Sequence, residues 1–166
     1  MEEKGKPKRV MTRVGDIFCV ELSEYKVYFQ FIAVDTSYLN STTIRVFNKR
    51  YPLDYVFDAE EVVRDEIKFC AHTMLQPGLK QNIWTKVGKS KDLGDLEHVL
   101  FRTTSDWSPQ HLKSYRWWVG GINKEYEMIG ELTEEYKEKT HLGAVMCPNT
   151  IVKRIEAGEY QGVWPY

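Results

Sequence analysis

The hydrophobic pattern is clearest between residues 14 and 35, where two runs of β-branched and aromatic residues flank a short polar break. This arrangement predicts a β-hairpin. Phe18 and Phe29 fall on one face of their strands, but the opposite faces are also largely apolar, as Ile17 and Tyr28 illustrate. A hairpin that is apolar on both sides is normally covered on both sides. We therefore predict that it lies centrally in a curled sheet or barrel.

Further strands are predicted wherever apolar and polar residues alternate between turn signals. These runs are residues 42–47, 66–72, 82–87, 97–103, 115–119 and 126–130. Residues 76–79 are predicted to form a turn, and residues 88–94 and 104–113 exposed loops.

Helices are expected at three places. Asp58 followed by Glu61 resembles a capping box that opens a short helix. Residues 133–136 predict one helical turn. Residues 148–158 begin with Pro and end with Gly, which is the usual punctuation of a helix. Its apolar stripe is expected to dock on the sheet.

These elements predict an α+β fold with a mainly antiparallel, strongly curved sheet or SH3-like barrel and short helices, including one near the C-terminus. A chain of 166 residues suits one domain with a substantial core. We expect a flexible N-terminal tail over residues 1–12 and a single globular domain over residues 13–166.

Tryptophans stand out among the polar segments. Trp117 and Trp118 are adjacent in a predicted strand, so they point to opposite faces and at most one enters a one-sided core. Trp107 lies in a polar loop beside Asp106. Aromatic residues presented with acids are typical anchors of protein interfaces. Alternatively, a long loop or the C-terminal residues 164–166 cover the outward-facing ring.

Charge and cysteine usage narrow the class of protein. The formal net charge of −1 disfavours a general nucleic-acid binder, which usually carries a basic excess. Basic residues do cluster within positions 4–9, in the expected tail. Cys19, Cys70 and Cys147 are widely spaced, which fits a reducing compartment better than a disulfide framework. We expect no signal peptide or membrane span, and hence a cytoplasmic protein.

Catalytic or metal-binding motifs are weak. Cys70 and His72 share a face of a predicted strand and could form a nucleophile pair, but we favour a buried Cys that acts as a small hydrophobic residue. Asp16 after Gly15 is interpreted as a turn feature rather than a catalytic carboxylate. The histidines show no metal-ligand spacing, so no metal site and no cofactor are predicted. They are His72, His98, His111 and His141.

Two segments carry a family resemblance. Residues 14–22, which contain Gly-Asp-Ile-Phe, and the aromatic strand at 28–32 resemble the opening of the immunity protein 26 family. Residues 152–158 are similar to its closing helix. The resemblance implies a mostly β, non-catalytic cytoplasmic protein of bacterial polymorphic-toxin systems that binds and neutralises a cognate toxin. Some relatives carry a phosphotriesterase-type label, so a hydrolase stays open.

The expected function is therefore an immunity protein that occludes the active site of its toxin. Acidic side chains would match a basic toxin cleft, and aromatic rings would anchor the contact. The candidates are Asp92, Asp95, Glu97, Asp106, Trp107 and Tyr115.

Two alternatives remain open. One is a small metal- or Cys-dependent hydrolase that needs His72, His98 or His111 to meet carboxylates in a pocket. The other is a β-barrel that binds single-stranded nucleic acid on its aromatic rings. The oligomeric state is left open by the sequence.

Overall fold

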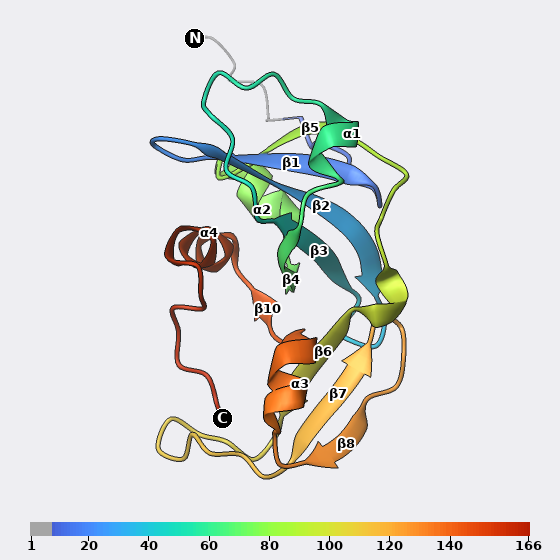
Figure 1. Cartoon of the computed structure of the whole chain (residues 1–166), viewed down its shortest axis with the longest axis vertical. Helices are drawn as coiled ribbons and strands as arrows, with labels where there is room; N and C mark the ends of the chain where they lie inside the picture. The colour runs from blue at the N-terminus through green and yellow to red at the C-terminus, as the bar shows by residue number, and fades with distance from the viewer. Residues whose placement is uncertain (1–7) are drawn as a thin grey trace, which may run out of the picture.

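The computed structural model describes residues 8–166 and contains two sheets, one above the other along the long axis (Figure 1). The larger has the strand order β10-β4-β3-β2-β1-β5 and the smaller β8-β7-β6-β9. The strands of the larger sheet are β1 (Asp16–Glu21), β2 (Lys26–Asp35), β3 (Ser41–Phe47), β4 (Ile67–Thr73), β5 (Thr85–Lys89) and β10 (Val145–Met146). Those of the smaller sheet are β6 (Leu100–Thr104), β7 (Trp117–Gly121), β8 (Glu127–Gly130) and β9 (Thr140–Leu142).

Short helices surround the sheets. They are α1 (Ala59–Val62), α2 (Leu75–Lys80), the 3₁₀ turn η1 (Leu96–His98), α3 (Glu134–Lys139) and α4 (Pro148–Ala157). The Asp58 side chain caps α1 by accepting from the backbone N–H groups of Glu60 and Glu61, as its position predicts. Gly158 ends α4 in the left-handed conformation.

The predicted hairpin is confirmed as β1 and β2, which pair antiparallel in the interior of the larger sheet. On one face, Phe18 stacks on Phe29 with ring centroids 5.0 Å apart. Trp84 contacts Phe29 edge-on, and Ile151 and Ile155 of α4 complete this core. The last helix therefore docks on the sheet, as its apolar stripe indicates.

The opposite face of the hairpin is also covered, as predicted. Ile17 and Tyr28 pack there against Phe47, Tyr51 and Val62. The segment that follows β3, together with α1, provides this cover. The hairpin is thus buried between two cores, which explains why neither of its faces is polar.

The expectation of one curved sheet or barrel is only partly correct, because neither sheet closes and the strands divide into two sheets. The short strands near residues 140–146 make this division. β9 pairs parallel with β6, whereas β10 pairs parallel with β4 of the other sheet. Between them, Gly143 passes so close to the carbonyl of Arg102 that an added Cβ would lie 2.6 Å from its oxygen. Both sheets are therefore mixed rather than purely antiparallel.

Local differences from the predicted elements have identifiable causes. Residues 76–79, predicted to be a turn, lie within α2, because Pro77 falls in the first helical turn where its missing N–H is tolerated. The strand predicted at 97–103 begins only at Leu100, after η1. The strand predicted at 82–87 is shifted to 85–89.

The predicted flexible tail over residues 1–12 falls partly on residues 1–7, which lie outside the described residues, as do Lys4 and Lys6 of the basic cluster. Residues 8–12 form no helix or strand. The carbonyls of Val10 and Met11 accept hydrogen bonds from the side chains of Gln76 and Lys86, at 2.8 and 3.1 Å. This short segment thus contacts the domain.

A glycine inside α2 provides a test of the packing. A Cβ added to Gly78 would lie 2.1 Å from Cε2 of the buried Trp84. Helix propensity alone predicts that Gly78→Ala stabilises the protein by about 1 kcal/mol. We expect the reverse, a loss of about 1–3 kcal/mol in the free energy of unfolding, because the indole must move. Urea unfolding measures it, with the exposed Lys80→Ala as control. Greater stability of Gly78→Ala would contradict this packing.

Candidate functional site

The loop between β6 and β7 is held together by one carboxylate. The side chain of Asp106 accepts from Thr104 Oγ1 at 2.8 Å, from Ser114 Oγ and from the backbone N–H of Tyr115 at 3.1 Å. These hydrogen bonds, the Ser114 one foremost, lower the pKa of Asp106 to about 2. The carboxylate is therefore ionised across the physiological range and ties both ends of the loop together.

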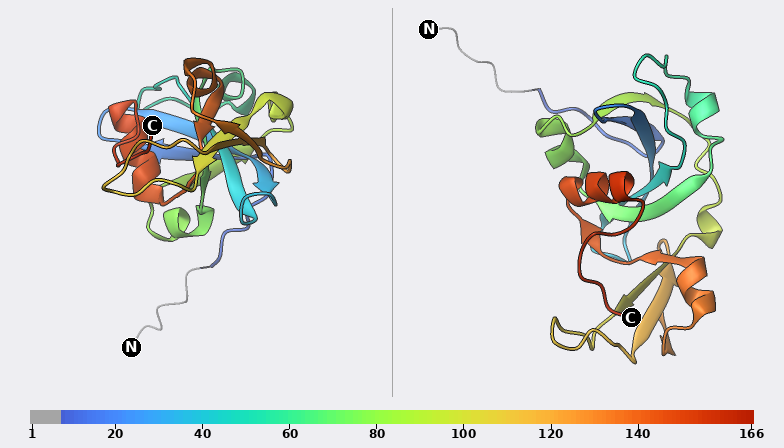
Figure 2. Two further views of the ribbon diagram at one scale, coloured as in Figure 1. Left: turned by 90° about the horizontal axis from the view of Figure 1, so that it is seen from below. Right: turned by 60° about the vertical axis from the view of Figure 1, so that its left-hand side comes forward.

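The C-terminus reinforces the same loop. Tyr166 donates its N–H to the Leu112 carbonyl at 2.9 Å and accepts at its own oxygen from Ser114 N–H at 2.7 Å. Figure 2 shows the chain running from α4 past the smaller sheet to this loop. The loop is thus fixed at its base and along one side, so it is preorganised despite its length.

Three aromatic side chains are exposed on this arrangement. Trp107 is 37% exposed, Tyr115 56% and Tyr166 60%. Lys113 Nζ lies 5.4 Å from the centroid of the Tyr115 ring. We call the exposed parts of Trp107, Tyr115 and Tyr166 the loop surface. Large rings on a fixed loop lose little conformational freedom on binding, which is typical of interface anchors.

The paired tryptophans behave as predicted. Trp117 is fully buried and donates its indole N–H to the Ser114 carbonyl at 3.2 Å. Trp118 faces the other way and is partly exposed. It lines a hollow of about 540 Å³ together with Tyr38 and Tyr126. Only one of the two rings therefore enters the core.

The predicted partner-binding residues fall into two groups at opposite ends of β6. Asp92, Asp95 and Glu97 precede the strand, and Asp106, Trp107 and Tyr115 follow it (Figure 1). A five-residue strand separates the groups by roughly 15 Å. They do not form one compact patch.

Several of the predicted acids already have partners. Asp95 contacts His98 at 2.6 Å, and Glu97 contacts Lys124 at 2.7 Å. All four of these side chains are largely exposed, so the pairs exchange readily with solvent and with a partner. Asp106, by contrast, is occupied in holding its own loop.

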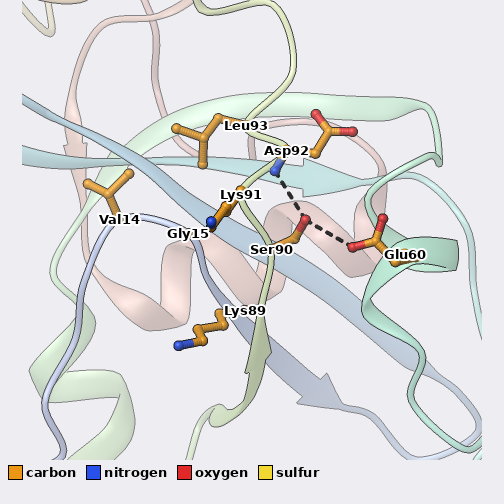
Figure 3. A pocket seen from close by; sticks show the side chains of 8 residues that line it. All are labelled: Val14, Gly15, Glu60, Lys89, Ser90, Lys91, Asp92 and Leu93. Carbon is orange, nitrogen blue, oxygen red and sulfur yellow. Dashed lines mark hydrogen bonds between the residues drawn. The ribbon is translucent and has the colours of Figure 1, made fainter.

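Asp92 lines a hollow of about 700 Å³ beside the start of β1 (Figure 3). Its carbonyl accepts from the buried Arg45 at 2.8 Å, and Arg45 Nε donates to Gln30 at 2.9 Å. Gln30 in turn donates to the Gly15 and Ser90 carbonyls, each at 3.2 Å. This chain of hydrogen bonds fastens the wall of the hollow to β2 and β3. We assign it a structural role because each buried amide and guanidinium group named here has a partner.

Cys70, the candidate nucleophile of the hydrolase alternative, is buried. Burial raises the pKa of the Cys70 thiol to about 12, the opposite of what an activated thiolate requires. Within residues 8–166 no three His, Cys, Asp or Glu side chains are grouped to hold a metal ion.

Asp16 accepts from Arg13 N–H at 2.7 Å and pairs with Lys86 at 2.8 Å, next to Gly15 at φ +99°. This confirms the turn interpretation.

A buried polar junction between the sheets escaped prediction. His72 Nε2 lies 2.9 Å from Asp35 Oδ2, and both side chains are fully buried. The His72 ring packs on Tyr38 and on Phe101, with centroid separations of 4.6 and 4.2 Å. Asp35 Oδ1 accepts from the Asn123 N–H at 3.0 Å. Asp35 ends β2 and Asn123 follows β7, so the carboxylate bridges the two sheets.

The protonation of the junction follows from its surroundings. Burial lowers the pKa of His72, although the hydrogen bond and charge of Asp35 oppose the shift. Burial opposes ionisation of Asp35, but hydrogen bonds from Ser37, Asn123 and His72 outweigh it and lower its pKa. A neutral imidazole that donates from Nε2 to an ionised carboxylate is consistent with the lowered pKa of His72 and with the lowered pKa of Asp35. A second proton on Nδ1 would be buried without an acceptor among the described residues.

Comparisons of the chain with protein-family models, curated proteins and solved structures find no match. In the described part of the chain, every helix is too short or too polar to cross a bilayer.

The junction predicts a pH dependence of stability. Because the pKa of His72 is lower in the folded state, the unfolded chain binds more protons as the pH falls below about 6.5. Stability is therefore lost from about pH 6.5 downward. We expect His72→Gln to reduce this slope by up to about 1.4 kcal/mol per pH unit.

Chemical denaturation at a series of pH values between 7 and 5 measures the slope. His141, whose pKa burial lowers to about 4, leaves a residual slope in the variant. The exposed His111→Gln serves as the matched control. Equal slopes for the wild type and His72→Gln would refute the assignment of a neutral His72.

Proposed function

We propose that this protein is a bacterial immunity protein that binds a cognate toxin domain in the cytoplasm and blocks its active site. The observation that carries the proposal is the loop surface, where Trp107 and Tyr115 are exposed on a loop fixed by Asp106 and Tyr166 is exposed on the C-terminal segment that pairs with it. The resemblance of residues 14–22 and 152–158 to the immunity protein 26 family points in the same direction.

Binding through the loop surface is favoured because its loop is already ordered before a partner binds. A loop that is already ordered does not lose its backbone freedom on association, so more of the contact energy appears as affinity. Aromatic rings bury large areas with only two rotatable side-chain bonds each. Stoichiometric inhibition needs a tight, shape-defined contact of this kind, and it requires no chemical step.

The acidic residues take two different roles in this proposal. Asp92, Asp95 and Glu97 lie on the segment between β5 and β6 and are exposed. They supply negative charge that accelerates encounter with a basic toxin cleft. Asp106 acts indirectly, because its oxygens position the loop that carries the rings. Asp106 is therefore a positioning residue rather than a charge donor to the toxin.

The proposal predicts that a toxin domain is encoded beside the gene of this protein, and the test uses that domain. We expect the double substitution Trp107→Ala and Tyr115→Ala to weaken toxin binding at least about 30-fold, which corresponds to about 2 kcal/mol. The loss arises because two rings that toxin binding would bury are removed from the contact. Isothermal titration calorimetry measures the affinity, and thermal unfolding verifies that the variant is folded.

Two further variants sharpen the result. Val56→Ala removes an exposed apolar side chain outside the loop surface, and we expect unchanged affinity. Asp106→Ala leaves all three rings in place but frees the loop, so we expect weaker binding with faster amide exchange in residues 105–116. Wild-type affinity for the double variant would remove the loop surface from the interface.

A further inference from the structure

A third hollow, of about 340 Å³, lies where β4 and α4 of one half meet β6 and β9 of the other. Its lining is unusually basic for a chain with a net charge of −1. Lys68, Arg102, His141 and Arg154 face it, and Glu138 and Glu159 also contribute to the wall. We call the four basic residues the basic pocket.

Arg154 has no acidic partner within residues 8–166. Its guanidinium carbon lies 3.9 Å from the centroid of the Phe69 ring, and its one hydrogen bond in the described chain runs to the Met146 sulfur at 4.0 Å. No carboxylate of the described residues lies within 4.0 Å of it. Burial, together with the positive charge of Arg102, lowers the pKa of Arg154 to about 10. The charged group with the largest influence on the pKa of Arg154 is thus another cation, Arg102.

Arg102 is held in place by backbone rather than by charge. Its Nη1 donates to the Thr140 carbonyl at 2.8 Å and to Thr140 Oγ1 at 3.1 Å. Its buried Nε has no hydrogen-bond partner within residues 8–166, and it makes no ion pair there. The guanidinium is therefore oriented but retains an unused donor.

Lys68 and His141 are the other two residues of the basic pocket. Lys68 Nζ donates to the Ile155 carbonyl at 3.0 Å, and burial, aided by nearby arginines, lowers its pKa. His141 Nδ1 accepts from the Cys70 N–H at 3.2 Å, so the neutral ring carries its proton on Nε2 and remains a donor. Every one of the four basic groups thus offers N–H donors and no acceptor toward a ligand.

The two acids of the wall do not neutralise these cations. Glu138 and Glu159 are exposed, and neither forms an ion pair with Arg102, Arg154 or Lys68. Lys137, which also lines the hollow, pairs instead with Glu134 at 2.7 Å. Two partly buried guanidiniums that repel each other cost the fold free energy unless an anion binds between them.

We propose that the basic pocket binds a phosphate group, either free or as a monoester on a small molecule. Paired guanidiniums match the oxygen geometry of phosphate, and an ammonium adds a third positive charge. A dianion balances these charges better than a single carboxylate does. This site is separate from the loop surface, and it stands whether or not the protein binds a toxin.

Thermal unfolding at pH 7.5 tests the site, with sodium phosphate compared with sodium chloride at equal ionic strength. We expect phosphate, at a concentration 100-fold above Kd, to raise the Tm by about 5–10 °C, because it binds only the folded state. Chloride produces no comparable rise. Equal Tm values in the two salts would overturn the proposal.

Arg154→Met separates specific binding from general salt effects. We expect this variant to have a higher Tm than the wild type without phosphate, because the repulsion with Arg102 is gone, and to lose the phosphate-dependent rise. Arg64→Met, at an exposed position outside the pocket, makes the same charge change and should keep the full rise. A full rise in Arg154→Met would also overturn the proposal.

Phosphorus NMR of the wild type gives a readout that does not depend on the variants folding. Line broadening of inorganic phosphate or of phenyl phosphate on addition of protein supports the site, and the tighter of the two identifies the source of the phosphate group. Should Arg154→Met fail to fold, Lys68→Met replaces it with the same expected loss. Absence of broadening for both compounds would refute the site.

Discussion

The contact between Asp35 and His72 is the interaction on which the arrangement of the two sheets depends. It places a carboxylate and an imidazole, both fully buried, at the point where β2 and β4 meet the strands of the smaller sheet. The carboxylate also accepts from the backbone of Asn123, in the turn between β7 and β8 of the smaller sheet. An unpaired charge in this position would be strongly destabilising, so the carboxylate favours the placement of the sheets in which the Asn123 N–H donates to it.

From this junction the structure extends to its exposed loop. Phe101 of β6 packs on His72, and β6 then runs outward to the loop that follows it. At the end of that strand, Thr104 and Asp106 fix the loop, and the C-terminal Tyr166 pairs with its backbone. A rigid connection thus links the buried junction to the exposed rings. This is the physical basis for treating the loop as a binding surface rather than as a mobile connection.

Local patterns predicted a good part of this fold. The hairpin of β1 and β2, its burial on both faces, the docking of α4 and the opposite orientations of Trp117 and Trp118 all follow from residue alternation and spacing. The division into two sheets does not, because β9 and β10 are too short to carry a pattern. Their pairing partners lie some distance away along the chain, and nothing in a local window encodes that choice.

The candidate sites were predicted less well, for a related reason. The exposure of Trp107 was predictable, because an aromatic residue in a polar loop is a local signal. Tyr115 was instead assigned to the strand predicted at 115–119, which begins only at Trp117. Asp106 was identified by type, but its role as the organiser of the loop depends on contacts with Thr104 and Ser114. The Asp35–His72 pair joins residues 37 positions apart, and the basic pocket gathers residues from β4, β6, β9 and α4, so only the folded chain reveals them.

The central claim is that the protein acts by presenting its loop surface to a toxin domain. Amide hydrogen exchange of the protein alone and in complex with that toxin domain tests it most directly. The account predicts slower exchange in residues 105–116 and at the C-terminal residues 164–166 when the toxin is bound. Unchanged exchange in both segments, with protection confined to other surfaces of the bound protein, would contradict it.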